Sequence, residues 1–379
     1  MCALDSSIVV GHVVYAFKNG GIERGILNII NYGDQKRFRH IVFCLTEVGQ
    51  FLNQLQSLNC RVIELHKRPG NDLRLPLRIA TQAREHGVSV LHARGWPAMV
   101  ETIMAARLAK VRHTIYGFHG KGIPELQGLA LRRRVAQKVV IRAYNRVVTL
   151  NHRMQADLAT ECGISANRIQ IISNGVDIDK FRPIPDRRAL RAKFNLPSDS
   201  FIIGNVARLD PVKNHQVILK AMCGAVGQGR KALLLIVGDG PQYRLLEQRI
   251  EELGLDGNVR LFGYSDCIAD LLNCMDVYVQ SSFYEGFSNT VLEAMACGVP
   301  ILATNVGGTS DILNDGQEGY FFLPSDHEHL LSLIMRLAGD RNLRNALGSM
   351  GRHRAITKFP VQTMVRSYEN LYSELTAQR

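Results

Sequence analysis

The apolar positions in the first half of the chain form short, nearly continuous runs, and the segments between them show the spacing of amphipathic helices. We expect strands at residues 8–15, 40–45, 62–64, 88–92, 113–118, 146–150 and 169–172. The helical spacing covers residues 22–31, 51–58, 75–86 and 97–110. Strands that are apolar throughout and alternate with helices are typical of a parallel α/β sheet.

A second alternation follows a break. Asn174-Gly175 is a turn signal, and residues 181–186 contain two prolines and no regular period. After a short helix at 187–194, we expect strands at 201–207, 233–237, 259–262, 277–280, 300–303 and 319–323. An amphipathic helix at 361–375 follows the break at Phe359-Pro360. The pattern therefore predicts two α/β domains, residues 1–172 and 173–358, and a terminal helical segment, 359–379.

Composition fits this picture. The 379 residues are enough for two domains, and no apolar run approaches the ~18 residues of a membrane-spanning helix. The N-terminus carries Asp5 and no basic region, so we expect no signal peptide and a cytoplasmic protein. The eight cysteines form no CxxC pair, and we expect them to be reduced thiols.

The positive charge is unevenly distributed. Residues 1–172 carry 24 Lys and Arg against 11 Asp and Glu, whereas residues 173–379 carry 22 against 23. The first half is therefore expected to face an anionic partner, such as a phosphate, a lipid surface or nucleic acid.

Three segments place candidate chemistry directly after predicted strands. Gly20-Gly21 follows the first strand and precedes a helix, as at a phosphate-binding turn or an ordinary strand–helix turn. Arg208 and Lys213 follow the strand at 201–207, and two cations there suit a diphosphate. Gly238 and Gly240 follow the strand at 233–237, where glycine permits close approach of a nucleotide.

The segment 281–293 is the most specific signal. Its loop from Gly286 to Thr290 opens a helix, and the amide groups at a helix start attract anions. Glu285 lies on the loop and Glu293 lies one to two turns into the helix, so both carboxylates are expected to face one ligand. Carboxylates beside a diphosphate suit a sugar nucleotide, because they accept hydrogen bonds from sugar hydroxyls.

With these motifs, the chain resembles retaining glycosyltransferases of the glycosyltransferase-4 type. The resemblance rests on SNGVD, GNVARLDPVKN, LLIVGDGP, VRLFGY and EGFSNTVLEAMACGVPILATNVGG in the second half. In the first half, GGIERGILNIIN, LHKRPGNDL, VLHARG and His119-Gly120 resemble exopolysaccharide-associated sugar transferases. The resemblance implies the GT-B fold, in which two doubly wound Rossmann-like domains face each other across a cleft and the last helix crosses back to the first domain.

The resemblance also implies roles for individual residues. Arg208 and Lys213 would bind the diphosphate of a UDP- or GDP-linked sugar, and Glu285 would hold the sugar hydroxyls. His119 would contact the donor sugar, and His92 is a weaker candidate for the same region. Further donor-binding residues are Gly21, Gly238, Arg260, Phe262, Gly286, Phe287, Ser288, Asn289, Thr290 and Glu293.

The mechanism expected from this set is front-side displacement without a protein nucleophile. We expect no cofactor and no metal, because two cations already neutralise the diphosphate. Asp177 and Asp179 spell a DxD motif in the interdomain linker, which we do not assign to metal. Residues 326–329 read as the start of a helix, with Ser325 and Glu328 forming a capping box.

The acceptor side is predicted from charge. A basic stripe follows the strand at 113–118 and suits anionic membrane lipids beside a glycan or polyprenyl-diphosphate-linked acceptor, or else a solvated helix face. Two other functions remain open: a sugar-nucleotide epimerase on the same fold, and a non-enzymatic nucleic-acid binder, although the basic half lacks interleaved aromatic residues. The stripe comprises Arg132, Arg133, Arg134, Lys138, Arg142 and Arg146.

Overall fold

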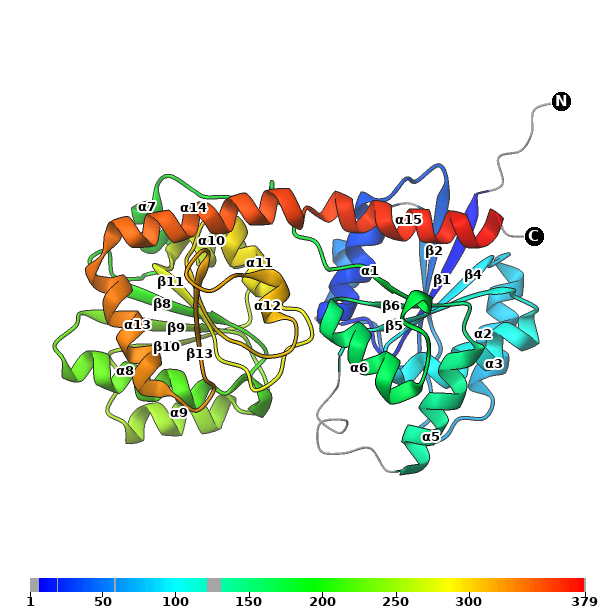
Figure 1. Ribbon diagram of the computed structural model, residues 1–379, viewed down its shortest axis with the longest axis horizontal. Coiled ribbons are helices and arrows are strands. Elements are labelled where there is room, and N and C mark those ends of the chain that lie inside the picture. The colour runs from blue at the N-terminus through cyan, green and yellow to red at the C-terminus, as the bar shows by residue number, and fades with distance from the viewer. Residues whose placement is uncertain (1–6, 19, 58, 121–130, 378–379) are drawn as a thin grey trace. The chain divides into compact units, whose positions relative to one another are not determined.

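The chain folds into two compact α/β units (Figure 1). A computed structural model describes residues 7–18, 20–57, 59–120 and 131–377. The first unit comprises Met1–Gly175 together with Val361–Arg379, and the second comprises Val176–Pro360. The last helix therefore belongs to the first unit although it follows the second in sequence.

The first unit is built on a seven-stranded parallel sheet in the order β3-β2-β1-β4-β5-β6-β7. The strands are β1 (Ile8–Val14), β2 (Phe38–Cys44), β3 (Cys60–Glu64), β4 (Val90–Arg94), β5 (His113–Phe118), β6 (Arg146–Thr149) and β7 (Ile169–Ile171). Its helices are α1 (Gly21–Tyr32), α2 (Leu75–Glu85), α3 (Met99–Ala109), α5 (Leu131–Val140), α6 (His152–Cys162) and α15 (Val361–Ala377).

Helix α15 is part of the core of the first unit. Its apolar face, which includes Val361, Val365 and Leu371, packs with Val10 of β1 and Val90 of β4. It also lies against α1, whereas α2, α3 and α5 form a separate group of neighbours (Figure 1). Burying this helix face stabilises the unit, because each fully buried aliphatic side chain contributes about 1.5–3 kcal/mol.

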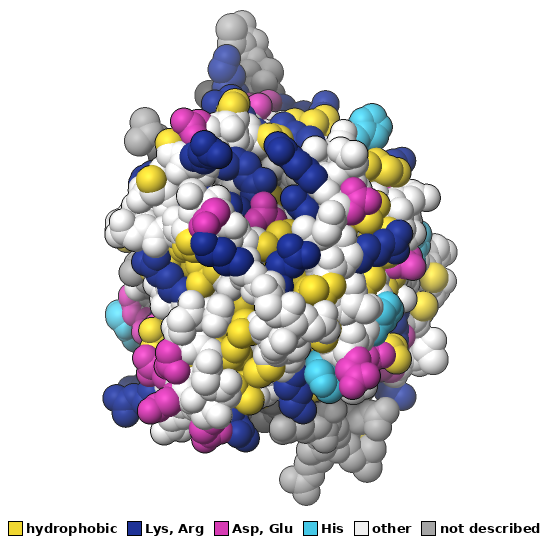
Figure 2. Space-filling view, turned by 90° about the vertical axis from the view of Figure 1, so that its left-hand side faces the viewer, with side chains coloured by type: hydrophobic (Ala, Val, Ile, Leu, Met, Phe, Trp, Pro, Cys, Tyr) yellow, Lys and Arg dark blue, Asp and Glu magenta, His cyan; other side chains and the backbone are white. Residues whose placement is uncertain are grey.

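The second unit has a six-stranded parallel sheet in the order β10-β9-β8-β11-β12-β13. The strands are β8 (Phe201–Val206), β9 (Ala232–Val237), β10 (Val259–Gly263), β11 (Val277–Gln280), β12 (Ile301–Thr304) and β13 (Gly319–Phe322). Its helices are α7 (Arg187–Lys193), α8 (His215–Gly227), α9 (Tyr243–Glu252), α10 (Ile268–Cys274), α11 (Asn289–Ala296), α12 (Thr309–Ile312), α13 (His327–Gly339) and α14 (Arg341–Lys358). Figure 2 shows one face of this unit, where Lys and Arg side chains gather in the upper part of the view with acidic side chains among and below them.

The predicted α/β architecture with two doubly wound parallel sheets is confirmed, and two local predictions are wrong. The helix predicted at 51–58 does not form over its described residues: a short 3₁₀ turn at Gln50–Gln54 ends at Leu55, which is extended. Such a short run without a capping side chain does not offset the entropy of helix nucleation. Helix α13 is capped by Asp326, whose carboxylate accepts from the His329 amide, and not by Ser325. No described helix combines the length and the apolar character needed to cross a bilayer.

Candidate functional site

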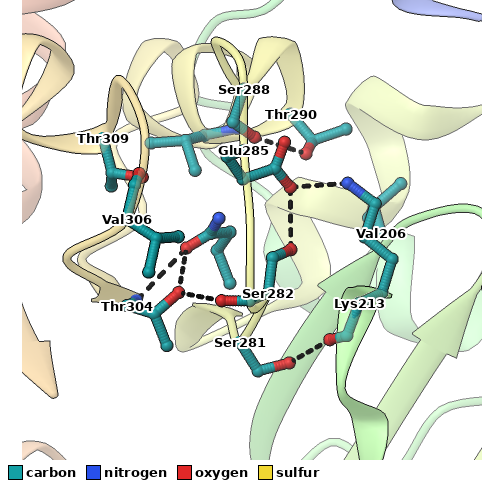
Figure 3. A network of polar contacts seen from close by, with 12 residues as sticks. Val206, Lys213, Ser281, Ser282, Glu285, Ser288, Thr290, Thr304, Val306 and Thr309 are labelled. Atoms are coloured by element: carbon teal, nitrogen blue, oxygen red, sulfur yellow. Dashed lines mark hydrogen bonds and ion pairs between the residues drawn. The ribbon is translucent and has the colours of Figure 1, made fainter. Parts of the chain in front are cut away.

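A polar cluster lies at the carboxyl ends of β8 and β11 in the second unit (Figure 3). The strand order reverses here, because β9 and β10 lie on one side of β8 and β11, β12 and β13 on the other. Connections at such a switch point leave in opposite directions, which opens a crevice where ligands bind in open α/β sheets. Arg208, Lys213, Glu285 and Ser288 all follow these two strands.

Lys213 and Glu285 form the centre of this cluster. The Lys213 Nζ lies 2.5 Å from Glu285 Oε1, and the Ser282 hydroxyl donates to the same oxygen over 2.8 Å. The side chain of Glu285 is only 11% exposed and that of Lys213 only 24% exposed. Partial burial strengthens this ion pair, because water screens it less than it screens a surface pair.

Backbone contacts fix both members of the pair. The Ser281 hydroxyl donates to the Lys213 carbonyl over 2.7 Å, and the Thr304 hydroxyl donates to the Ser282 carbonyl over 2.7 Å. Gly307 has φ of +56°, and a Cβ built there would lie 1.5 Å from the Glu285 carbonyl oxygen. Only glycine fits at residue 307, so the loop after β12 determines where the Glu285 backbone lies.

The start of α11 provides the second part of the cluster. Ser288 is the N-cap, and its hydroxyl accepts from the Val291 amide. The buried Tyr278 of β11 connects this helix start to β8, because its hydroxyl lies 2.8 Å from the Thr290 hydroxyl and 3.1 Å from the Val206 carbonyl. The network holds this helix start, with its partial positive charge, next to the Lys213–Glu285 pair. Asn289 is the first residue of α11.

The other predicted donor residues of this unit are placed as follows. Arg208 is exposed, with Nε 3.2 Å from Asp210 Oδ2. Gly238 has φ of +142°, and a Cβ there would meet the Ala207 carbonyl at 1.9 Å, so glycine lets the two loops cross. Gly286 lies on the loop and Glu293 is half-buried within α11. Phe287 is buried edge-on to Phe359, with ring centroids 5.9 Å apart, and thus has a packing role.

Arg260 and Phe262 are not part of the cluster around Lys213. They lie on the edge strand β10, which β9 separates from β8. The Arg260 guanidinium donates to the carbonyls of Phe194 and Asn195 and lies over the Phe262 ring, which is edge-on to Phe194. Both side chains therefore anchor the end of α7, and only their backbone is left for the predicted contact with the donor.

In the first unit, His119 directly follows β5. The residue is half-buried, and its Nε2 is enclosed with no hydrogen-bond partner among the described residues. A Cβ at Gly117 would lie 2.8 Å from this nitrogen and 3.1 Å from His92 Nε2. Burial, with a further contribution from the charge of Arg94, lowers the pKa of His119 to about 3, so its ring is neutral at pH 7.

The first unit also contains a buried polar network centred on Arg94. Arg94, only 1% exposed, donates from one Nη2 to His12 Nδ1 over 3.1 Å and to the Tyr372 hydroxyl over 3.4 Å. Because a guanidinium only donates, the Tyr372 hydroxyl accepts from Arg94, and it also lies 3.1 Å from His92 Nδ1. For the same reason, His12 donates from Nε2 to His40 Nδ1, also 3.1 Å away. A single buried cation thus sets the tautomers of His12 and His40, whose rings are neutral.

The environment of Gly21 differs from that of a free anion-binding turn. Gly21 opens α1, but the first turn of this helix holds Glu23, whose carboxylate interacts with its own backbone amide. Burial raises the pKa of Glu23 to about 7. A Cβ at Gly20 would meet the Glu23 carboxylate, which shows how closely this side chain folds over the turn.

The described residues contain no cluster of three or more His, Cys, Asp or Glu side chains that is suited to a metal ion. Asp177 of the DxD motif uses Oδ1 to accept from the amides of Asp179 and Lys180, as in an Asx turn. The seven described cysteines are all free thiols.

Comparison with known proteins identifies the family. The chain matches the family described as "Glycosyl transferases group 1" over residues 186–354 and the family described as "Glycosyltransferase Family 4" over residues 19–180. The chain belongs to these glycosyltransferases. The first match contains the Lys213–Glu285 cluster, and the second contains Arg94, His92 and His119, whereas His12 and Tyr372 of the Arg94 network lie outside it.

Relatives of this glycosyltransferase extend over most of its length. It is 26% identical over 317 residues to N-acetyl-alpha-D-glucosaminyl L-malate synthase of Bacillus anthracis, covering 81% of this chain and 80% of that protein. It is 24% identical to UDP-Gal:alpha-D-GlcNAc-diphosphoundecaprenol alpha-1,3-galactosyltransferase of Escherichia coli, covering all of both. The crystal structure of Anabaena Alr3699/HepE in complex with UDP and glucose has a TM-score of 0.85 at 22% identity, covering 97% of this chain and 100% of that chain, which confirms the GT-B fold.

Several residues of the glycosyltransferase were missed from its sequence. Ser282, Tyr278 and Gly307 support the site in the second unit, and Arg94 and Tyr372 organise the network in the first. The polar residues His12, His92 and Arg94 interrupt otherwise apolar strands, a pattern that indicates a buried polar cluster. No local signal links Tyr372 to this cluster, because the residue lies 278 positions after Arg94.

Proposed function

We propose that this glycosyltransferase transfers a sugar from a nucleotide diphosphate sugar to a carbohydrate or lipid-linked acceptor in surface or exopolysaccharide synthesis, with retention of anomeric configuration. The observation that carries the proposal is the Lys213–Glu285–Ser282 cluster beside the start of α11. A cation, a helix start and a carboxylate in one place suit a diphosphate joined to a polyhydroxylated sugar. The E. coli relative, named for UDP-Gal, and the Anabaena structure, which is a complex with UDP, support a uridine nucleotide.

The reaction we propose is a front-side displacement. The acceptor oxygen forms the new bond to the anomeric carbon on the face from which the nucleotide diphosphate leaves, and a leaving phosphate oxygen takes the acceptor proton. Arg208, Lys213 and the amides at the start of α11 stabilise the negative charge that develops on the departing phosphate. Glu285 positions the sugar by accepting hydrogen bonds from its hydroxyls, and neutral His119 contributes a hydrogen bond from the first unit.

We further propose that the reaction needs no divalent metal. Arg208 and Lys213 provide positive charge at the diphosphate, and the carboxylate of Asp177 is used within its own turn. Activity that is unchanged after dialysis against EDTA is the expected result, whereas activity restored only by Mg²⁺ or Mn²⁺ would contradict it.

The acceptor we favour is linked to polyprenyl diphosphate, as the name of the E. coli relative supports. Such an acceptor lies in a membrane, and the basic stripe of the first unit is the predicted point of contact. The structure describes three of its side chains: Lys138 is exposed, whereas Arg142 donates to the carbonyls of Lys138 and Gly163 and Arg146 to that of Asn145. Arg132, Arg133 and Arg134 lie in α5, and their side chains are outside the described residues.

A panel of nucleotide sugars in a thermal-shift assay tests donor binding first. The cognate donor should raise the unfolding temperature of the native chain, and this rise should be lost in Glu285→Ala. Release of nucleotide diphosphate should then depend on the acceptor. Release without acceptor, or interconversion of the donor sugar, would favour an epimerase, and a gel shift with nucleic acid at moderate salt would favour the binding-protein alternative.

A further inference from the structure

Three neighbouring elements of the first unit each expose an apolar pair spaced four residues apart. Helix α3 contacts both α2 and α5 (Figure 1). In a helix, residues four apart lie on the same face. This applies to Met104 and Leu108 on α3 and to Val135 and Val139 on α5, whereas Leu73 lies in the turn before α2 and Leu77 in its first turn. The six side chains are between 45% and 87% exposed.

These apolar pairs are not the core-facing side of their helices. Helix α5 buries Gln137 while it exposes Val135 and Val139, which reverses the usual amphipathic arrangement. The described part of the first unit has nine exposed large apolar side chains, and six of them belong to these three elements; the other three are Tyr15, Tyr32 and Leu52. Scattered apolar residues need no explanation, but a concentration of this kind marks an interaction surface.

In the sequence, a cationic residue lies between the two members of each apolar pair. Arg74 lies between Leu73 and Leu77, Arg107 between Met104 and Leu108, and Lys138 between Val135 and Val139, and all three cations are exposed. Within the described residues, none of the three forms an ion pair.

Acidic side chains nearby do not cancel this charge. Asp72 forms an ion pair with Arg78, and the carboxylate of Glu101, one turn before Met104, is largely buried. Burial raises the pKa of Glu101, which disfavours its negative form. The face formed by the three apolar pairs and their three cations, which we call the α2–α3–α5 face, is therefore both apolar and positively charged.

We propose that the α2–α3–α5 face docks on an anionic lipid bilayer, with the apolar pairs in the interfacial layer and Arg74, Arg107 and Lys138 at the lipid phosphates. The proposal rests on the proposed function, because a lipid-linked acceptor requires the enzyme at a membrane. Alternating apolar and cationic side chains on exposed helices are the pattern of interfacial binding, where apolar burial and attraction to anionic headgroups act together.

The charge of this face argues against a second copy of the chain as its occupant. A two-fold dimer brings the same patch against itself. Arg74, Arg107 and Lys138 would then meet identical cations while being withdrawn from water, which costs several kcal/mol for like charges. An acidic protein would satisfy the cations but would leave the exposed leucines unexplained unless it also presented apolar side chains.

Flotation of the full chain with lipid vesicles tests the proposal. The vesicles are phosphatidylcholine alone or phosphatidylcholine with phosphatidylglycerol. The apolar variant carries Met104→Gln, Leu108→Gln, Val135→Asn and Val139→Asn, and the charge variant carries Arg107→Gln and Lys138→Gln. The matched control carries Met350→Gln and Ile356→Gln, which replace two exposed apolar residues on α14 of the second unit.

The native chain and the control should float with anionic vesicles and much less with neutral ones. The apolar variant should bind about tenfold less, because each buried apolar group adds to membrane affinity, and the charge variant should lose its preference for anionic lipid. Equal flotation of native chain and apolar variant, equal loss in the control, or no flotation of the native chain would overturn the proposal. A dimer in solution that only the apolar variant dissociates would instead assign the face to self-association.

The failure of docking and the failure of the proposed function are distinguishable. All four proteins should show the same thermal shift with the donor sugar nucleotide and the same transfer to a water-soluble acceptor, because the substitutions lie outside the Lys213–Glu285 cluster. A native chain that transfers sugar but does not bind vesicles would overturn only the membrane proposal, whereas a native chain that binds vesicles but transfers no sugar would overturn the proposed function.

Discussion

Lys213 Nζ lies 2.5 Å from Glu285 Oε1, and this partly buried ion pair joins the loop after β8 to the loop after β11. If Lys213 stabilises the leaving diphosphate, Lys213→Ala should reduce kcat/KM by about 10²–10³-fold, as the loss of a transition-state donor does. Steady-state assays with the cognate donor measure this effect.

A double-mutant cycle with Glu285→Ala would show that the pair acts as a unit, because coupled residues give non-additive losses. The control is Lys231→Ala, which breaks an exposed ion pair with Asp199 in the same unit and should leave kcat/KM unchanged. Full additivity of the two active-site substitutions would contradict the proposed coupling.

Gly307→Ala should damage both the stability of the second unit and donor binding. Its φ of +56° strains alanine, and the added Cβ would overlap the Glu285 carbonyl oxygen. We expect a loss of about 3 kcal/mol or more in the free energy of unfolding, together with a higher donor KM.

Gly229→Ala is the control that introduces backbone strain without the steric overlap expected in Gly307→Ala. Gly229 has φ of +71°, but nothing lies within 4 Å of the position that a Cβ would take there, so the variant should lose only about 1 kcal/mol. Equal losses in Gly229→Ala and Gly307→Ala would show that the contact with Glu285 contributes nothing.

Tyr372→Phe should destabilise the first unit, although the residue lies on the last helix. It removes the hydroxyl that accepts from Arg94 and forms a hydrogen bond with His92, and both of these residues are buried. Leaving buried polar groups unpaired costs about 1–3 kcal/mol. The single tryptophan, Trp96, lies in this unit, so its fluorescence during denaturation reports on this unit specifically. Tyr15→Phe, at an exposed tyrosine, should change nothing, and an equal loss there would argue against the network.

Acid should destabilise the first unit through its buried histidines. Burial lowers the pKa of His40 to about 4 and that of His12 and His92 well below 6.5, so these rings stay neutral in the folded state while the unfolded chain takes up protons. The stability they contribute is therefore present above pH 6.5 and is lost as pH falls toward 4. Glu23 opposes this trend, because its raised pKa of about 7 means that the folded state binds a proton there.

His40→Gln tests how much the titration of this one histidine contributes to the pH dependence of stability. Between about pH 6 and pH 4.5, the free energy of unfolding of the variant should fall less steeply than that of the native chain, by about 1.4 kcal/mol per pH unit. Trp96 fluorescence at several pH values gives both slopes. Identical slopes would mean that His40 titrates alike in the folded and unfolded states.

Much of the fold could be predicted because parallel strands that are buried on both faces leave continuous apolar runs. The strands at 113–118 and 277–280 agree with β5 and β11 residue for residue. The segment 51–58 was misassigned as a helix, because its apolar spacing is also satisfied by a short turn in which Phe51 packs against Phe17. Local spacing alone does not distinguish the two.

The site was predictable only in part. Lys213 and Glu285 lie 72 residues apart, and the expectation that they share a site followed from their places after strands of one sheet. Arg260 and Phe262 also lie on a strand of that sheet, yet their side chains pack on Phe194. The direction of a side chain depends on its neighbours in space, and the sequence does not show these neighbours.

The sequence by itself determined the two α/β units, their strands and the cations and carboxylates that follow strand ends, because these features depend on apolar periodicity and on the direction of parallel strands. Only the tertiary structure decided that Glu285 pairs with Lys213, that Gly307 holds its loop, and that Tyr372 of the last helix reaches Arg94. Those contacts depend on how distant segments pack, which is set by the summed burial of both cores.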